Sequence, residues 1–427
     1  MVLPKITHRR RYQLLEVTYA TITLFSLTQG PVYQLWSRSA EYQRFVALPT
    51  IGHAHFATFV AIQIPALALL VRRLSGDFLR QRRGQFLLAF HLWLGLTVLW
   101  STLARHSLPE FVSLVLTTSV GLYLATTFTR VQFWGILTAA MSCGLAMSLI
   151  AVWRNWDGAV SEEERYWIGV YFNRNSLAPV AAGALLGIVG IVSVLRERWS
   201  RRTISASIGL AAVAGVAVFV LWRTESRTSP LALAVAVGAL LVWFVARSVT
   251  THRIPRAVRD TAPVAVAVAA VVMFMALRTV GGLSTVSGET STFNSRGALW
   301  SLSWTGFLEK PFHGWGWMAA WRTPLFFKQG TWWAVWDTDW SHNGYHDVLL
   351  GGGVLAMVLF AGMVWFGVRA LGSSTSFGDV APSFLLVCFV LAAATQESFF
   401  IGTHFLWALL IAGLFSPISS VSSGNND

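Results

Sequence analysis

Long apolar runs alternate with short polar segments along almost the whole chain. Each run has about 18 residues or more, enough for a helix to cross about 30 Å of hydrocarbon. We predict membrane-spanning helices at residues 14–36, 47–71, 85–103, 109–127, 131–153, 171–195, 204–222, 229–249, 261–280, 345–368, 380–397 and 399–416. The pattern therefore predicts an all-α, polytopic membrane protein with about 12 transmembrane helices.

One long segment, residues 281–344, interrupts this alternation. We expect it to form a large external loop that carries short amphipathic helices at the membrane surface. It separates nine predicted transmembrane helices in residues 1–280 from three in residues 345–416. The last residues, 417–427, are small and polar, and we expect them to be disordered.

The composition agrees with a membrane protein. Hydrophobic residues make up 55% of the chain and charged residues 12%, whereas about 25% charged residues is typical of soluble domains. The net charge of +13 is explained by basic residues that flank spans, and no soluble basic domain exists to bind nucleic acid. Cys143 and Cys388 both fall in apolar runs, so they predict neither a disulfide framework nor a metal cluster.

The distribution of Lys and Arg predicts the orientation. If the N-terminus is cytoplasmic, 19 of the 32 basic residues lie on the inner side, and both termini are cytoplasmic. The segment 281–344 is then external. Tryptophan is concentrated in it, and these side chains form either an interfacial belt or a stacking surface for sugars and isoprenoid chains, or both.

Polar side chains stand out at four places on the predicted outer side. They are Asn173, Arg174 and Asn175 at the start of the sixth span, Arg223 and Arg227 in the link 223–230, Arg296 near the start of an expected amphipathic helix, and the turn 341–347. A single arginine at a span end usually extends its guanidinium to lipid headgroups. Several arginines on one face instead favour a pyrophosphate, which guanidinium groups bind through paired hydrogen bonds.

The expected amphipathic helix has Asn294 or Ser295 as a predicted N-cap. No Walker-type glycine loop supplies an alternative phosphate site. The glycines at 351–353 lie inside a predicted span and indicate a close helix contact, while GWGWM at 314–318 indicates a turn within the loop.

The turn SHNGYHD contains two histidines with different possible roles. His342 and His346 are four residues apart and would share a helix face, which suits a zinc pair completed by Asp339 or Asp347. Asn343-Gly344 is a turn signal, however, so the two histidines need not lie on one helix. A histidine at this boundary is also suited to act as a general base, kept neutral by nearby arginine charges.

The motifs together resemble the O-antigen ligase and polymerase superfamily of bacterial membrane proteins. The resemblance is carried by LWLGLTVLWSTLARHSLPEF (92–111), YFNRNSLAPVAAGALLG (171–187), SRTSPLALAVAVG (226–238), SRGALWSLSWTGFLEKPFHGWG (295–316) and SHNGYHDVLLGGGVLAMVLF (341–360). Two features of the last motif bear on its site. His346 stands where the family usually has Leu, and Asp347 is close to the usual acidic residue.

The resemblance implies twelve spans with an external loop over a lateral cavity in the bacterial cytoplasmic membrane. It implies metal-independent, inverting transfer of a glycan from a polyprenyl-pyrophosphate donor to a glycan or glycolipid acceptor, without a cofactor. Arg227 and Arg296 would hold the pyrophosphate and His342 would be the base. Possible supporting residues are Arg223, Asn173, Arg174, Asn175, Asn343, His346 and Asp347.

Some alternatives stay open from the sequence. The site chemistry is the same for a ligase and a polymerase, and either His342 or His346 could act as the base. Among other classes, a secondary transporter or lipid-linked glycan flippase is the main competitor, because twelve spans fit many transporters. A scaffold of an envelope assembly is a third interpretation.

Overall fold

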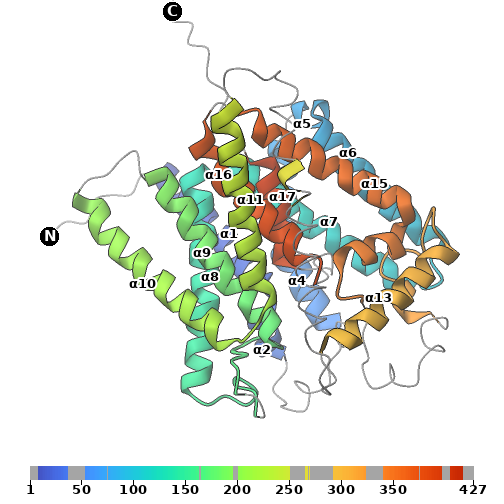
Figure 1. The fold of residues 1–427 in the computed structure, drawn as a ribbon, viewed down its shortest axis with the longest axis horizontal. Helices are drawn as coiled ribbons and strands as arrows, with labels where there is room; N and C mark the ends of the chain where they lie inside the picture. The colour runs from blue at the N-terminus through green and yellow to red at the C-terminus, as the bar shows by residue number, and fades with distance from the viewer. Residues whose placement is uncertain are drawn as a thin grey trace, which may run out of the picture.

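A computed structural model describes residues 8–36, 53–74, 76–162, 165–195, 201–250, 265–267, 269, 292–323, 340–374, 376–396 and 404–416. Within these residues the chain is all-helical, and its one β feature is an isolated bridge between Val160 and Trp167. The prediction of an all-α protein is confirmed for this part of the chain. Figure 1 shows long helices side by side, with α10 at one edge and α13 at the other.

The helices follow the apolar runs of the sequence. They are α1 His8–Ser26, α2 Gly30–Trp36, α4 His53–Arg73, α5 Asp77–Arg80, α6 Arg82–Thr97, η1 Val98–Trp100, α7 Ala104–Thr127, α8 Arg130–Trp153, α9 Arg174–Leu195, α10 Arg201–Arg223, α11 Thr228–Thr250, α13 Thr292–Glu309, η3 Ala320–Arg322, α15 Gly344–Gly372, α16 Phe377–Ala393 and α17 Phe405–Phe415.

Six of the described helices are long and apolar enough to cross a membrane, namely α4, α7, α8, α9, α11 and α15. Five other predicted spans coincide with shorter or less apolar helices, so the total of twelve stays a prediction. The first predicted span is two helices, because the chain turns between α1 and α2, where Gln29 has a φ of 72°. The ninth, 261–280, lies outside the described residues apart from 265–267 and 269.

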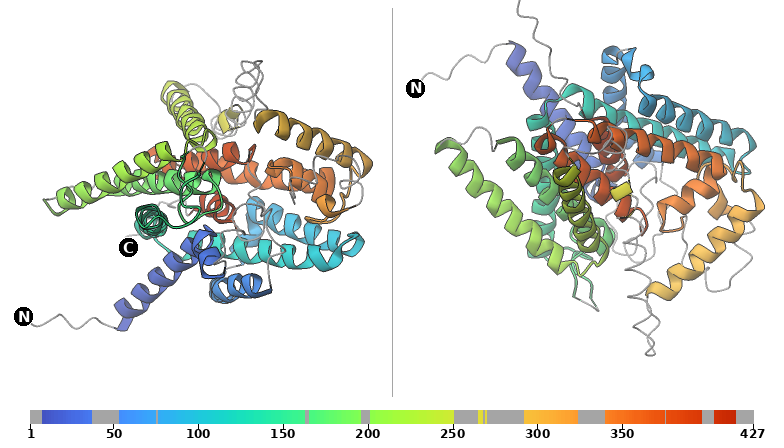
Figure 2. Two further views of the ribbon diagram at one scale, coloured as in Figure 1. Left: turned by 90° about the horizontal axis from the view of Figure 1, so that it is seen from below. Right: turned by 45° about the horizontal axis from the view of Figure 1, so that its top comes forward.

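The short helix α17 forms the centre of the molecule. All eleven of its residues are buried, which is the pattern of a helix that is apolar on every side. Trp407 of α17 donates from Nε1 to Thr118 Oγ1 on α7 at 2.7 Å, and Thr118 Oγ1 lies 2.8 Å from His91 Nε2 on α6. Figure 2 shows α17 surrounded by other helices in both further views.

Helices α11 and α16 pack side by side in opposite directions. The Trp243 ring of α11 lies 4.4 Å from the Phe384 ring and 4.9 Å from the Phe377 ring, centroid to centroid. Near the end of α11, Arg247 Nη2 donates to the Ser374 carbonyl just before α16, at 2.7 Å. The beginning of α11 therefore lies at the same end of the bundle as the end of α16.

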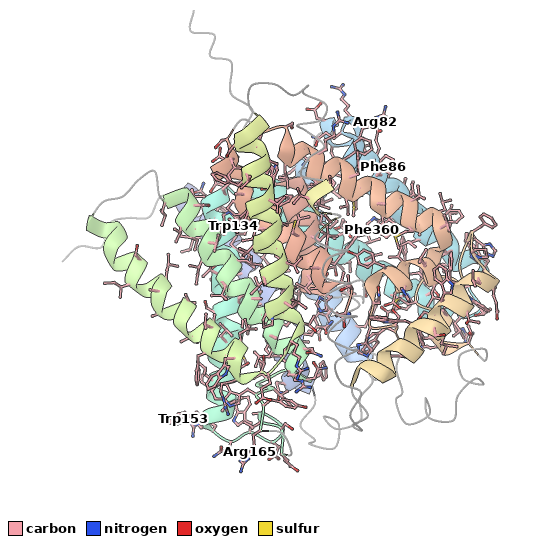
Figure 3. The ribbon with its side chains drawn as sticks, viewed as in Figure 1. Arg82, Phe86, Trp134, Trp153, Arg165 and Phe360 are labelled. Carbon is pink, nitrogen blue, oxygen red and sulfur yellow. The ribbon has the colours of Figure 1, made fainter. Side chains whose placement is uncertain are left out.

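Several basic residues of the predicted inner side join helix ends to one another. Arg130, at the start of α8, forms a 2.6 Å ion pair with Asp379, and Arg73 pairs with Glu16. Arg83, at the start of α6, donates to the Leu414 carbonyl at 2.6 Å. Figure 3 labels Arg82 at this end of the molecule and Trp153 and Arg165 at the opposite end. Which end meets the cytoplasm stays a prediction.

Helix α15 is broken at Gly353, where φ is 69° and ψ is −168°. The carbonyls before the break accept other donors: Leu350 O from Trp315 N at 2.8 Å, and Gly352 O from Trp93 Nε1 at 2.7 Å. After the break, Val354 N donates to Pro311 O at 2.7 Å. The predicted close helix contact is found at Gly352, where an added Cβ atom would lie 2.8 Å from Leu94 of α6, but the sequence did not predict the helix break at Gly353 against residues 311–316.

These bonds explain why the break is tolerated. Backbone groups in hydrocarbon must find partners inside the protein, and irregular backbone is stable there only where it packs against other protein. The glycine-rich turn at 314–316 supplies two of the partners, since Gly316 N also donates to Gly351 O, at 3.2 Å. The first half of α15, which follows the turn 341–343, is therefore fixed in direction by the segment 311–316.

Candidate active site

The turn from Ser341 to Asn343 is closed by its own hydrogen bonds. Ser341 Oγ donates to the Asn343 carbonyl at 2.6 Å, and Asn343 N donates to Ser341 Oγ at 3.0 Å. Between them His342 has a φ of 52°, in the left-handed region that few non-glycine residues adopt. The two outer residues are fully buried, whereas His342 is partly exposed. The turn therefore presents the imidazole outward from a rigid base.

Asn343 caps helix α15, which begins at Gly344. Its Oδ1 accepts from Tyr345 N at 3.0 Å and from His346 N at 3.3 Å. The prediction that Asn-Gly separates the two histidines is confirmed, because His342 precedes the helix and His346 lies on its first turn. Gly344 N donates to Ala394 O at 2.8 Å, which attaches the turn to the end of α16.

The carboxylate of Asp347 bonds to the turn and to a neighbouring tryptophan. Its Oδ1 accepts from Ser341 N at 3.0 Å and from Trp321 Nε1 at 3.3 Å, and the residue is 3% exposed. A buried carboxylate needs such donors, because charge in a low-dielectric environment is costly unless hydrogen-bonded. Asp347 thereby connects the turn to η3, and no signal in the sequence indicated that Trp321 was its partner.

The indole of Trp340 determines the tautomer of His342. Trp340 Nε1 donates to His342 Nδ1 at 3.3 Å, with the two ring centroids 5.6 Å apart. An indole N–H can only donate, so Nδ1 is unprotonated, and the neutral ring carries its proton on Nε2. The nitrogen of His342 that can accept a proton is therefore Nδ1.

Helix α13 packs against this turn. Trp300 Nε1 donates to Ser341 O at 3.2 Å, and the Trp300 ring lies 6.1 Å from that of His346. Arg296 lies four residues before Trp300 on the same helix, or about 6 Å along its axis. The backbone of Arg296 is thus one turn from a residue that contacts the His342 turn. The predicted N-caps are wrong, because α13 begins at Thr292 and both Asn294 and Ser295 lie within it.

Arg227 ends the link between α10 and α11. Its carbonyl accepts from Leu231 N at 3.3 Å, and its side chain is exposed. Among the described residues we find no hydrogen bond or ion pair of its guanidinium. Because α11 begins where α16 ends, and Gly344 is bonded to Ala394 at that end, Arg227 lies at the same end of the bundle as His342.

The asparagines before α9 support this link. Asn173 precedes α9 and its Oδ1 accepts from Ser176 N at 3.0 Å, as a helix cap does. Asn175 Oδ1 accepts from Ser226 Oγ at 2.9 Å, which attaches the residue before Arg227 to α9. Both side chains therefore act in local structure, and Asn175 also fixes the position of the link.

Two of the predicted arginines lie against aromatic rings. The Arg223 guanidinium carbon is 5.3 Å from the Trp167 ring centroid, and Arg223 Nη2 donates to Arg165 O at 3.5 Å. That of Arg174 is 4.5 Å from the Tyr166 ring centroid. These contacts hold Arg174 of α9 and Arg223 of α10 against the loop between α8 and α9.

The structure therefore brings together one set of the predicted residues. His342, Asn343, His346 and Asp347 form a continuous hydrogen-bonded unit, with the backbone of Arg296 one turn away on α13. Within the described residues no group of three His, Cys, Asp or Glu side chains is arranged to hold a metal ion. Asp339, the other proposed zinc ligand, lies outside the described residues.

Comparison with known protein families gives one match. The model of the O-antigen ligase family matches residues 210–361, from α10 to the middle of α15. This range contains Arg227, Arg296 and His342. No curated protein matches the chain. Residues 210–361 are thus similar to the O-antigen ligase family, as the motifs in the sequence had suggested.

Proposed function

We propose that the protein transfers a glycan from a polyprenyl-pyrophosphate donor to an acceptor hydroxyl, with inversion, at the outer face of the cytoplasmic membrane. The family match supports a membrane glycan transferase of the ligase or polymerase type. The observation that carries the finer proposal is the presentation of His342. Its imidazole is partly exposed, and the hydrogen-bonded turn around it fixes the position of Nδ1.

In the proposed reaction, the acceptor hydroxyl donates to His342 Nδ1 in place of the Trp340 indole. The hydroxyl oxygen attacks the anomeric carbon as its proton passes to Nδ1. The bond from that carbon to the pyrophosphate oxygen breaks, and the pyrophosphate leaves with the electron pair. A single displacement from the opposite face inverts the anomeric configuration.

Arg227 and Arg296 are proposed to bind the leaving pyrophosphate. Guanidinium groups stabilise the charge that develops on its oxygens, which is the usual role of fixed cations in phosphate chemistry. Support for Arg227 comes from its exposed side chain and from its place at the His342 end of the bundle. Arg296 is supported by its spacing from Trp300. With two arginines matching the charge, the proposed reaction requires no divalent metal.

His342 is preferred to His346 as the base. His342 lies outside the helix with Nδ1 held by a side chain that a substrate can displace. His346 lies on the first turn of α15, and within the described residues no hydrogen bond to its Nδ1 sets the tautomer of its ring. The two variants His342→Ala and His346→Ala therefore separate the two assignments.

The experiment uses the full-length protein in lipid nanodiscs with a polyprenyl-pyrophosphate oligosaccharide and a lipid-linked acceptor. Transfer should proceed in excess EDTA and should be lost in His342→Ala, with Arg227→Gln and Arg296→Gln each strongly reduced. Arg105→Gln is the matched control, since Arg105 is exposed at the start of α7 and belongs to no part of the site. Full activity of His342→Ala would refute the assignment of the base. A product ladder that lengthens with time would identify a polymerase, and a single transfer a ligase.

Transport is the second candidate, because α15 is broken at Gly353. Discontinuous helices often bind substrates in secondary transporters. Nanodiscs do not enclose a compartment, so transport cannot be measured in them. Proteoliposomes loaded with labelled lipid-linked glycan would test the transport hypothesis. Movement of the label across the bilayer without a covalent product would favour a transporter or flippase.

A further inference from the structure

Two polar side-chain atoms at the start of α15 are buried and have no hydrogen-bond partner in the part of the chain that the structure describes. They are Nδ2 of Asn343, whose residue is 0% exposed, and Nδ1 of His346. Buried polar groups are almost always paired in native proteins, and each exception requires an explanation. Neither atom is used by the proposed reaction, although both residues adjoin His342.

The cap fixes the orientation of the Asn343 amide. Because Oδ1 accepts from two backbone N–H groups, the NH2 group must point away from the helix end. Oδ1 accepts from His346 N, so the Asn343 amide lies beside the backbone of His346 at the start of α15. The orphan donor is therefore built into the turn, since a rotation of the amide would lose the cap.

The pair is complementary to a hydroxyl group. An amide NH2 can only donate, whereas the neutral imidazole can accept at Nδ1 when its proton is on Nε2. A hydroxyl oxygen can accept from Asn343 and donate to His346 at the same time. A carboxylate or phosphate oxygen has no proton to donate, so it would satisfy the amide and leave Nδ1 unpaired.

The neighbouring side chains also suit a sugar. The Trp300 ring lies 6.1 Å from the His346 ring and is held in place by its bond to Ser341 O. Aromatic faces pack well against the apolar C–H face of a pyranose. Asn343 is fully buried, and His346 is partly exposed although its Nδ1 is buried, so a hydroxyl would have to enter past the imidazole ring.

We infer that Asn343 Nδ2 and His346 Nδ1 form a subsite for one hydroxyl group of the acceptor sugar, next to His342. This inference rests on the proposed function, because it assigns the sugar to the acceptor. Asn343 follows His342 directly in the turn, so a sugar held by one hydroxyl brings another towards His342. Asn343 and His346 are then positioning residues that select the acceptor.

The test measures binding without transfer. The probes are methyl glycosides of common hexoses and their monodeoxy derivatives, added to the full-length protein in nanodiscs without donor, and binding is followed by ligand-detected NMR. Asn343→Ser keeps a capping oxygen but has no NH2, and His346→Phe keeps the ring beside Trp300 but has no Nδ1. Each variant should bind the preferred glycoside about threefold to tenfold more weakly, the usual effect of one neutral hydrogen bond.

The deoxy probes locate the hydroxyl. Removal of the recognised hydroxyl should weaken binding to the wild-type protein and make no further difference in either variant. Unchanged binding in both variants would overturn the inference, as would the absence of glycoside binding to the wild-type protein. If Asn343→Ser lowers the thermal unfolding temperature, His346→Phe alone decides. The binding measurement contains no glycan donor and does not depend on transfer. If the wild-type protein showed no transfer in the nanodisc assay, the proposed function would be contradicted, but the measured glycoside binding would still stand.

Discussion

The break of α15 can be tested by the substitution Gly353→Ala. The backbone there has a φ of 69° and a ψ of −168°, a combination that is essentially restricted to glycine. A Cβ atom added at this position would lie 2.4 Å from both the carbonyl carbon and the carbonyl oxygen of Phe312. The alanine side chain can therefore be accommodated only if the segment 311–316 moves away from α15.

The size of the effect follows from two costs. A non-glycine residue in this backbone region costs about 1–3 kcal/mol. Movement of the segment would also lose the 2.7 Å bond from Val354 N to Pro311 O, and a buried donor left without a partner costs about 1–3 kcal/mol. We expect the free energy of unfolding to fall by about 2–6 kcal/mol.

Activity should fall as well, because the first half of α15 follows the His342 turn. A misplacement of about 1 Å at a catalytic group can reduce the rate by about a hundredfold. Thermal unfolding in detergent and the transfer assay would be measured on the same preparation. Gly135→Ala is the control, since a Cβ atom at Gly135 of α8 would meet nothing within 4 Å. A Gly353→Ala protein as stable and active as wild type would show that the break is not required.

Three further substitutions test the site and its supports. Asp347→Asn keeps an acceptor for Ser341 N and should retain transfer activity within a few-fold of wild type. Asp347→Leu should lose most of the activity, because two buried donors are left unpaired. Equal activities of the two variants would show that the carboxylate does not hold the turn. Arg223→Gln should lower the free energy of unfolding by about 1 kcal/mol or less, since the guanidinium lies over aromatic rings. The KM for the donor should be unchanged. A large rise in that KM would indicate that Arg223 binds the pyrophosphate. Thr118→Val should destabilise the protein by about 2–5 kcal/mol, because two donor or acceptor partners in the core are lost, while Thr118→Ser should melt near the wild-type temperature.

The helices were largely predictable because a span leaves a strong signal in the sequence. The run predicted at 131–153 is α8 at Arg130–Trp153, and the one predicted at 204–222 is α10 at Arg201–Arg223. Hydropathy carries no information on backbone angles, however, so the break at Gly353, which lies inside an apolar run, could not be predicted. The break between α1 and α2 escaped prediction for the same reason, since Gln29 is an unusual residue for a positive φ.

At the site, the sequence indicated the residue types better than their partners. The Asn-Gly pair indicated that the two histidines need not share a helix, and the structure places His342 before the helix that Asn343 caps. The sequence could not show which arginines are free to bind a pyrophosphate, because their aromatic neighbours come from other elements. Arg223 of α10, for example, contacts Trp167 in the loop between α8 and α9. Trp321 and Trp340 were noticed only as members of a tryptophan-rich segment, whereas their indole N–H groups bond to Asp347 and His342.

The buried centre of the protein has a consequence for its biogenesis. Helix α17 has 11 residues and is about 16 Å long, too short to cross the hydrocarbon layer by itself. It also follows every other described helix in the chain, so the ribosome completes it after the helices that enclose it. The helices that enclose α17 can therefore reach their final packing only after it has been made, and we expect a chain that ends before Phe405 to lack its buried centre and to be degraded.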